Sequence, residues 1–311
     1  NERWDKNSQL IYKFDNNMTT PGYSHLNIGG RLDYQHKTHL DGEILTLSYM
    51  LAVTRPHTIF RQMYNNMVNF PVNYTSYDQN TRERFTEHTF QIDYVRPFGK
   101  HHKIESGTKY ILRYNNSTSL MDYQGTTPDM ESKFKHNAQV AAAYLSYIFT
   151  AGKWAARAGL RYEFTRMKAS YPDGSNADYH ANLNDWVPSA SLQYKISDGQ
   201  TLKVSYNTSI NRPGIGYLNP AIISTPTAVS FGNANLGSSR NQKLQLVYML
   251  VTSKLTLQLS PYYSFTNNGI GRILYEQNRK DVSTYQNVLK SKDFGISSYT
   301  EWTPFTGTSF T

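Results

Sequence analysis

Three charged residues, Arg157, Arg161 and Glu163, stand at odd-numbered positions within one short segment of the chain. Residues two apart on a β-strand project from the same face, so these side chains would form one row. Guanidinium and carboxylate groups arranged in this way can pair with one another, hydrate a cavity or bind a polar solute. Further charged residues occupy the corresponding positions of other segments: Asp33, Asp93, Lys109, Arg113 and Lys203.

Other groupings of reactive residues are weak. His36 and His39 have a metal-ligand spacing but stand in a predicted turn rather than on a helix. Residues 173–178 (DGSNAD) offer oxygen ligands without the spacing and closing glutamate of an EF-hand. The carboxylates are scattered, which gives no support to a paired-carboxylate enzyme, and the chain has no cysteine. We therefore predict no catalytic residue, no metal site and no cofactor, and a protein that is not an enzyme.

The row of charges belongs to a segment with two unlike faces. Its even positions hold Trp154, Ala156, Ala158, Leu160, Tyr162 and Phe164. The same alternation recurs in residues 192–196, 202–206, 244–250 and 255–259, with charge on one parity only. This period of two predicts β-strands with one apolar face and one polar face.

The length of the strands and of the connections between them indicates which kind of β-protein this is. Strands of about ten residues can cross a bilayer when tilted. Tight turns are predicted at residues 98–100, 151–153, 197–200 and 252–254, and long polar loops at 168–184 and 212–238. Short turns at one end and long loops at the other are typical of an outer-membrane barrel. We predict an all-β, antiparallel transmembrane β-barrel; the alternative is a large secreted all-β protein, although sandwich strands are usually only about five or six residues long.

Composition fits the same class. The chain has 25 tyrosines, which suit the headgroup zone of a membrane, and a mean hydropathy of −0.62, which argues against a helical membrane protein. The net charge of +9 is consistent with an anionic partner such as lipopolysaccharide, or with solvated loops and a hydrated lumen. Basic and aromatic residues follow strand parity rather than a groove, so we expect outer-membrane lipid as a partner and no nucleic acid.

The alternation extends over residues 1–311 as one barrel domain, in which we count about a dozen strands. The long polar stretch at residues 57–84 is interpreted as an external loop with strand extensions, and the stretch at 116–131 as another loop. Residues 271–277 and 283–289 are interpreted as separate strands. A new strand begins near Thr308, and the first residues show no signal peptide. We interpret the chain as a fragment of a larger barrel that lacks its closing strands; an independent barrel of about twelve strands is the alternative.

Four short motifs carry a family resemblance: residues 185–192 (DWVPSASL), 211–213 (NRP), 218–220 (LNP) and 232–236 (GNANL). In this order they resemble the β-barrel portion of Bacteroidota TonB-dependent outer-membrane receptors, which include the starch-utilisation-type transporters. The resemblance covers nearly the whole chain. Two positions depart from the pattern, because Ala234 stands where proline is usual and residues 237–239 replace a Lys-Pro-Glu run, so we expect a more flexible loop there.

The resemblance implies a barrel of about 22 strands, filled by an N-terminal plug domain and energised through TonB. Such a receptor imports a scarce or bulky solute, such as a glycan, a peptide or a metal chelate, in some cases with a surface lipoprotein partner. We expect the plug domain and the TonB box to lie outside these residues. The alternative is a passive porin-like channel or a structural, adhesin-like barrel.

Two groups of residues are candidates for contact with a solute. Inward-facing charges would line the lumen and contact the plug or the solute, or would simply hydrate and pair inside the barrel. They are Arg113, Arg157, Arg161, Glu163 and Lys203. Long loops face the outside, and loop residues are common binding residues. The candidates in residues 212–235 are Arg212, Tyr217, Asn219, Asn233 and Asn235.

Overall fold

A computed structural model describes residues 1–311 apart from 6, 219–222, 225–226, 279, 306–307 and 311. Eleven of the described strands are long: β2 (Leu10–Lys37), β3 (Ile44–Val68), β4 (Tyr74–Phe98), β5 (His102–Gly125), β6 (Met130–Ala151), β7 (Trp154–Ser170), β8 (Tyr179–Ser197), β9 (Gln200–Asn211), β12 (Ser239–Val251), β13 (Leu255–Gln277) and β14 (Lys280–Phe305). The short elements are β1 (Glu2–Trp4), α1 (Ile215–Leu218), β10 (Ile223–Ser224), β11 (Ala228–Ser230) and β15 (Thr308–Phe310).

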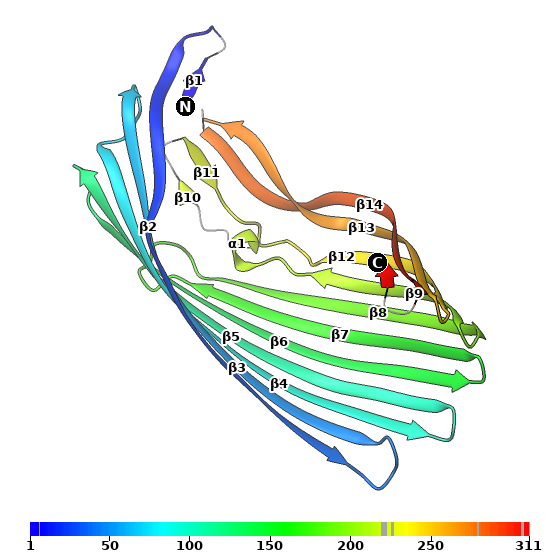
Figure 1. The fold of residues 1–311 in the computed structure, drawn as a ribbon. Coiled ribbons are helices and arrows are strands. Elements are labelled where there is room, and N and C mark those ends of the chain that lie inside the picture. The colour runs from blue at the N-terminus through cyan, green and yellow to red at the C-terminus, as the bar shows by residue number, and fades with distance from the viewer. Residues whose placement is uncertain (6, 219–222, 225–226, 279, 306–307, 311) are drawn as a thin grey trace.

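All these strands belong to one sheet, which confirms the predicted all-β, antiparallel class. Chain neighbours pair antiparallel from β1 to β9, and β9 continues through β12 and β13 to β14. The pairing of β11 with β14 is parallel. The sheet curls into a trough with α1 inside it (Figure 1). Within the described residues β2 does not pair with β14, so this sheet is open along that side.

The strands are longer than the sequence suggested, and several predicted loops were wrong. The stretches at 57–84 and 116–131 are mostly strand, which leaves connections of residues 69–73 and 126–129. The loop expected at 168–184 shrinks to residues 171–178. Residues 271–277 and 283–289 belong to β13 and β14, whose pairing continues to Gln277 and Lys280. Polar strands remain paired beyond the apolar band because the backbone ladder does not depend on which side chains it carries.

The outward face carries the apolar band. Leu160 is 47% exposed and Leu192 is 42% exposed on this face. Two aromatic contacts between β7 and β8 lie near the two ends of the band, Trp154 with Tyr194 and Tyr162 with Trp186, with ring centroids 4.5 and 4.7 Å apart. The outward apolar residues of β7 extend from Trp154 to Phe164, and these ten steps rise about 33 Å along the strand. A tilt of about 45° reduces this to about 23 Å, close to the apolar band of an outer-membrane barrel.

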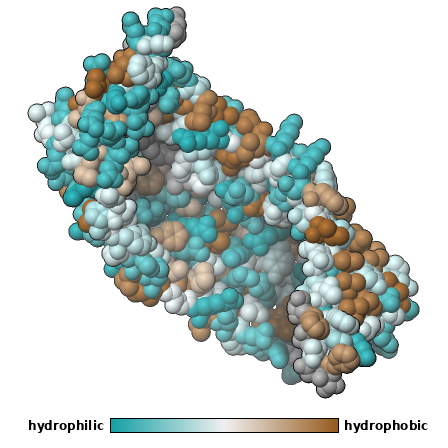
Figure 2. All heavy atoms as spheres, turned by 45° about the horizontal axis from the view of Figure 1, so that its top comes forward, coloured by the Kyte–Doolittle hydropathy of each residue, from teal (hydrophilic) through white to brown (hydrophobic). Residues whose placement is uncertain are grey.

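The opposite face is the inner face, which Figure 2 shows as a hollow with many hydrophilic residues. Near the long-loop end it carries a small apolar core, in which Leu218 of α1 and Leu236 pack against the wall. The other members of the core are Ala138, Met167, Ala169, Tyr179 and Leu183. We call the described part of residues 212–238 the inner loop. The sequence predicted that this loop would project outward, but it folds into the trough.

Candidate functional site on the inner wall

Two carboxylates lie side by side beneath the inner loop. Glu163 of β7 and Asp185 of β8 are direct partners in the strand register. Both side chains are on the inner face and both are buried, with residue exposures of 7% and 2%. Like charges placed directly opposite each other destabilise a sheet unless cations or hydrogen-bond donors compensate them.

The first residue of the inner loop supplies one compensating cation. Arg212 forms an ion pair with Glu163 Oε2 through Nη2. On the other side, Arg161 Nε lies 2.5 Å from Glu163 Oε1. Burial lowers the pKa of Arg212, and the positive charges of Arg161 and Arg113 lower it further. The carboxylate of Glu163 thus compensates positive charge on two neighbouring guanidinium groups, those of Arg161 and Arg212.

The far end of the inner loop binds the second carboxylate. Ser238 donates a 2.7 Å hydrogen bond to Asp185 Oδ2, and Arg240 Nη2 lies 3.6 Å from Asp185 Oδ1. The loop is therefore held at both ends by adjacent carboxylates of the wall. We call Glu163, Asp185, Arg212 and Ser238 the carboxylate clamp.

Two asparagines satisfy the backbone of the loop next to the clamp. Asn287 accepts a 2.9 Å hydrogen bond from the Gly237 amide and donates to the Gly237 carbonyl at 3.1 Å. Asn268 donates to the Ser238 carbonyl at 2.6 Å and accepts from the Arg240 amide at 3.1 Å. These contacts fix the position of the loop, because buried backbone groups without partners would cost free energy. A cavity of about 490 Å³ adjoins them.

The remaining predicted lumen residues lie on the same face. Arg113 Nε is 2.6 Å from Glu87 Oε2, and Arg157 Nη2 is 2.8 Å from Glu105 Oε2. Lys203 is exposed on this face and forms no salt bridge within the described residues. Most of these charges are therefore paired across strands. A paired arrangement suits a hydrated wall, and it leaves polar atoms facing the hollow.

The predicted loop residues divide into two roles. Asn233 is committed to the loop itself, because its Nδ2 donates to the Tyr285 carbonyl at 2.9 Å and its Oδ1 accepts from the Asn235 amide at 2.9 Å. Tyr217 is 42% exposed and makes an edge contact with Tyr285, with ring centroids 4.6 Å apart. Asn235 is exposed. Asn219 lies outside the described residues.

An aromatic cluster at the long-loop end of β2–β5 was not predicted. Tyr77 and Tyr123 are register partners, with the parity of Glu87 and Arg113, so they face inward. Tyr74 and Tyr123 have ring centroids 4.8 Å apart, and those of Phe14 and Phe70 are 4.1 Å apart. The mouth cluster comprises Tyr12, Phe14, Tyr64, Phe70, Tyr74, Tyr77 and Tyr123. Such a surface combines apolar ring faces with phenol hydroxyls.

Neither Asp185 nor its partners were singled out as site residues from sequence. The parity of Asp185 indicates an inward side chain, but Ser238 is 53 positions away and Asn287 stands in another strand. No local pattern predicts these contacts. Among the described residues, no group of three or more His, Cys, Asp or Glu side chains is placed to hold a metal ion. The described part of the chain also has no helix long and apolar enough to cross a membrane.

Several solved receptor structures share this fold. The siderophore receptor PiuA from Acinetobacter baumannii matches with a TM-score of 0.65 and 14% identity, covering 91% of this chain and 45% of that chain. The ferric yersiniabactin uptake receptor FyuA from Yersinia pestis matches with a TM-score of 0.61 and 15% identity, covering 93% of this chain and 42% of that chain. The hemophore receptor HasR from Serratia marcescens, in complex with its hemophore HasA and heme, matches with a TM-score of 0.58 and 13% identity, covering 97% of this chain and 55% of that chain.

This chain thus spans about half the length of the solved structures that it matches. No curated protein sequence matches it. The outer membrane protein beta-barrel family matches residues 36–311, which places the protein in the outer membrane. On this match, the chain belongs to the outer membrane protein beta-barrel family.

Proposed function

We propose that this chain forms part of the barrel of an outer-membrane receptor that imports a solute with energy supplied through TonB. The observation that carries the proposal is the inner wall: charged pairs such as Arg113–Glu87 and Arg157–Glu105 face a hollow. The solved proteins of similar fold include receptors for siderophores and for a heme-carrying hemophore, and a copper transporter. Polar walls of this kind hydrate a passage or contact a plug.

The complete barrel in this proposal has about 22 strands and contains a plug domain encoded outside residues 1–311. The open edges of β2 and β14 would pair with further strands, because exposed backbone donors and acceptors have no partner in lipid. The motifs at residues 185–192 and 232–236 favour the starch-utilisation type of receptor, which works with a surface lipoprotein. Resemblance of motifs is the support for that branch.

The mouth cluster is the candidate capture surface for the solute, together with exposed Tyr217 and Asn235. Aromatic ring faces bind the apolar faces of sugars, of aromatic side chains and of chelating ligands, while phenol hydroxyls bind their polar edges. This fits a glycan, a peptide or a metal chelate. The paired charges deeper in the wall, with Arg161, Glu163 and Lys203, would contact the solute or the plug afterwards.

Replacement of Tyr123 by alanine tests the capture surface. In the full-length receptor, Tyr123→Ala should weaken uptake of the imported solute about fivefold to tenfold, because an aromatic anchor in a binding surface contributes about 1 kcal/mol or more. Tyr110→Ala is the matched control, since Tyr110 is on the same strand but on the outward face. Equal losses in both variants would contradict capture at the mouth cluster.

A passive porin-like channel is the competing function, and dependence on TonB separates the two. The solute is identified by the growth defect of a strain that lacks the receptor. Deletion of TonB should abolish uptake of that solute, and the purified receptor should show no steady conductance in a planar bilayer. Uptake that persists without TonB, together with open-channel conductance, would establish the porin function instead.

A further inference from the structure

A shallow cavity lies on the inner wall next to the mouth cluster, on its short-turn side. It has a volume of about 250 Å³, and we call it the β3–β4 pocket. Tyr77 of the mouth cluster lies beside it, because the ring centroids of Tyr77 and Phe60 are 6.3 Å apart. The mouth cluster therefore continues into this pocket. The lining residues are Pro56, Thr58, Phe60, Gln79, Thr81 and Glu83.

A proline interrupts the strand pairing at this pocket. The register of β3 with β4 includes Thr54 with Phe85 and resumes at His57 with Arg82. Pro56 stands in the gap, and proline has no backbone N–H to donate to a ladder. The two strands are otherwise paired along most of their length. The pocket therefore forms at a break in the ladder.

Glu83 carries the one charge among the side chains that line the pocket. It is half-buried and faces inward, since it has the parity of Glu87 on β4. Glu87 pairs with Arg113, whereas Glu83 forms neither a salt bridge nor a side-chain hydrogen bond within the described residues. Its sequence neighbours Arg82 and Arg84 have the opposite parity and project outward. Glu83 is thus an uncompensated carboxylate on a wall whose other charges are mostly paired.

The polar groups beside Glu83 offer acceptors rather than free donors. Gln79 Nε2 donates to Ser119 Oγ at 3.0 Å and to Thr81 Oγ1 at 3.4 Å, so its amide hydrogens are engaged. Thr81 Oγ1 and Ser119 Oγ lie 3.0 Å apart and share a hydrogen bond. The amide oxygen of Gln79 and the carboxylate oxygens of Glu83 can accept. The pocket therefore suits a ligand group that donates hydrogen bonds and carries positive charge.

A primary ammonium group meets both requirements. It has three N–H donors, no acceptor and a positive charge. The rings of Phe60 and Tyr77 attract a cation through their π faces. A neutral hydroxyl would leave the charge of Glu83 uncompensated, and an anionic group would be repelled. Pockets that enclose a whole small ligand usually measure about 300–1,000 Å³, so this one would hold only one end of a ligand.

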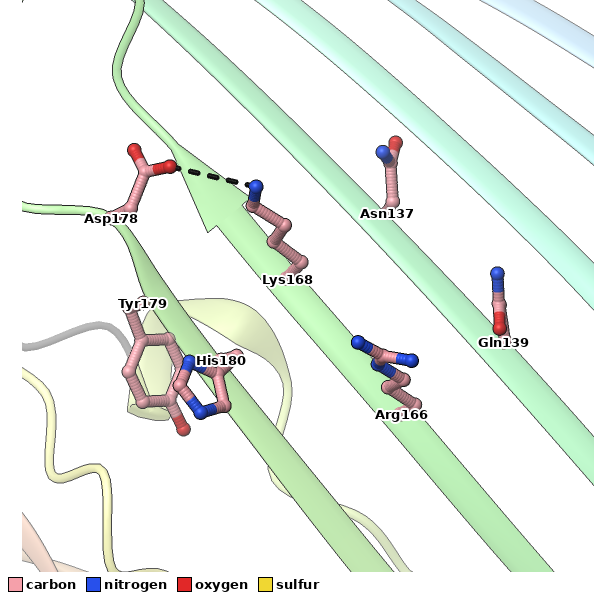
Figure 3. A pocket seen from close by; sticks show the side chains of 7 residues that line it. All are labelled: Asn137, Gln139, Arg166, Lys168, Asp178, Tyr179 and His180. Atoms are coloured by element: carbon pink, nitrogen blue, oxygen red, sulfur yellow. Dashed lines mark ion pairs between the residues drawn. The ribbon is translucent and has the colours of Figure 1, made fainter.

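A larger cavity on the outward wall has the opposite character (Figure 3). It has a volume of about 530 Å³ and is lined by Arg166, Lys168 and Asp178, among others. Alternation along β7 directs Arg166 and Lys168 outward, because Met167 and Ala169 are buried in the core on the inner face. Asp178 is already paired there, with Oδ2 3.6 Å from Lys168 Nζ. This compensated carboxylate is therefore a suitable control.

We propose that the β3–β4 pocket binds a primary ammonium group of the imported solute, with Glu83 as the counter-ion. The assignment rests on the proposed import function and narrows the solute to amine-bearing compounds, such as an amino sugar or a peptide with a free N-terminus. The mouth cluster would hold the ring or apolar part of the solute while the ammonium end enters the pocket.

Ligand-observed NMR titration of the purified full-length receptor tests the proposal, with 2-phenylethylamine as the probe and 2-phenylethanol as its neutral counterpart. The parental receptor should bind the amine about tenfold more tightly, because only the ammonium forms a charge-assisted hydrogen bond with Glu83. Glu83→Gln keeps the shape of the side chain without its charge and should abolish this preference. Asp178→Asn is the matched control and should retain it.

Equal affinity of the parental receptor for the amine and the alcohol would overturn the proposal, as would a preference that survives Glu83→Gln. Retained heat-resistant mobility on gel electrophoresis shows that each variant is folded. Displacement of the amine probe by a glucosamine tetramer, but not by its N-acetylated form, would identify an amino sugar as the source of the ammonium. Displacement by a tetrapeptide, but not by its N-acetylated form, would identify a peptide.

The titrations also separate the pocket from the transport function, because they require no TonB. Loss of the amine preference would overturn the assignment of the pocket and leave the import function standing. Uptake that persists without TonB would overturn the import function and leave the measured binding unaffected.

Discussion

The two faces of β7 and β8 place neighbouring residues in opposite surroundings. On the inner face, Glu163 and Asp185 are buried and bound by the inner loop. On the outer face, Arg166 and Lys168 are exposed at the edge of the apolar band. Inside, each charge needs a specific partner because water is excluded; outside, surplus charge remains open to solvent and lipid headgroups. Strand parity thus decides which charges are structural.

Removal of Glu163 should have the largest effect. Glu163→Ala leaves Arg161 and Arg212 without their common anion, and loss of one partner of a buried ion pair costs about 3–5 kcal/mol. Hydrogen exchange in residues 227–238 should accelerate about a hundredfold or more. The matched control is Lys203→Gln, which alters an inner-face charge that has no salt bridge within the described residues. Unchanged exchange in Glu163→Ala would show that the clamp does not hold the loop.

A charge placed in the apolar band should have the next largest effect. Leu160 is exposed on the outward face between the two aromatic pairs. Leu160→Arg should lower the free energy of unfolding in lipid by about 2–4 kcal/mol, measured by urea titration. Lys203→Gln should change it by less than about 0.5 kcal/mol. Equal changes would mean that the two faces are wrongly assigned.

Asp173, in the connection between β7 and β8, gives a small effect that depends on pH. Its carboxylate accepts hydrogen bonds from the Lys133 amide at 2.7 Å, from the Ser175 hydroxyl at 2.7 Å and from the Ser175 amide at 3.0 Å, which lower its pKa to about 2. A lowered pKa means that these bonds stabilise the connection fully above about pH 4 and are lost as the pH falls through about 2. The amide shift of Ser175 should titrate with that midpoint, and Asp173→Asn should abolish the titration.

The alternation of apolar and polar residues along the strands was the source of most of the correct predictions from sequence. The alternation around Leu160 placed strands and faces correctly, because each face of a strand meets one environment along its length. Loop lengths were overestimated at residues 57–84 and 116–131, since polar strands beyond the membrane keep their backbone pairing. The fold of the inner loop was not predictable either. It depends on contacts such as Ser238 with Asp185, which join residues distant in sequence.

The central claim is that the inner loop covers the inner wall, and thiol labelling tests it directly. Residues 1–311 contain no cysteine, so an introduced thiol reports alone once any cysteine elsewhere in the receptor is replaced by serine. Ala169 is fully buried beneath the loop, whereas Asn235 is exposed. In the full-length receptor in its membrane, Ala169→Cys should resist a water-soluble maleimide that labels Asn235→Cys, and should become reactive when combined with Glu163→Ala. Labelling of Ala169→Cys as fast as Asn235→Cys with the clamp intact would contradict this account.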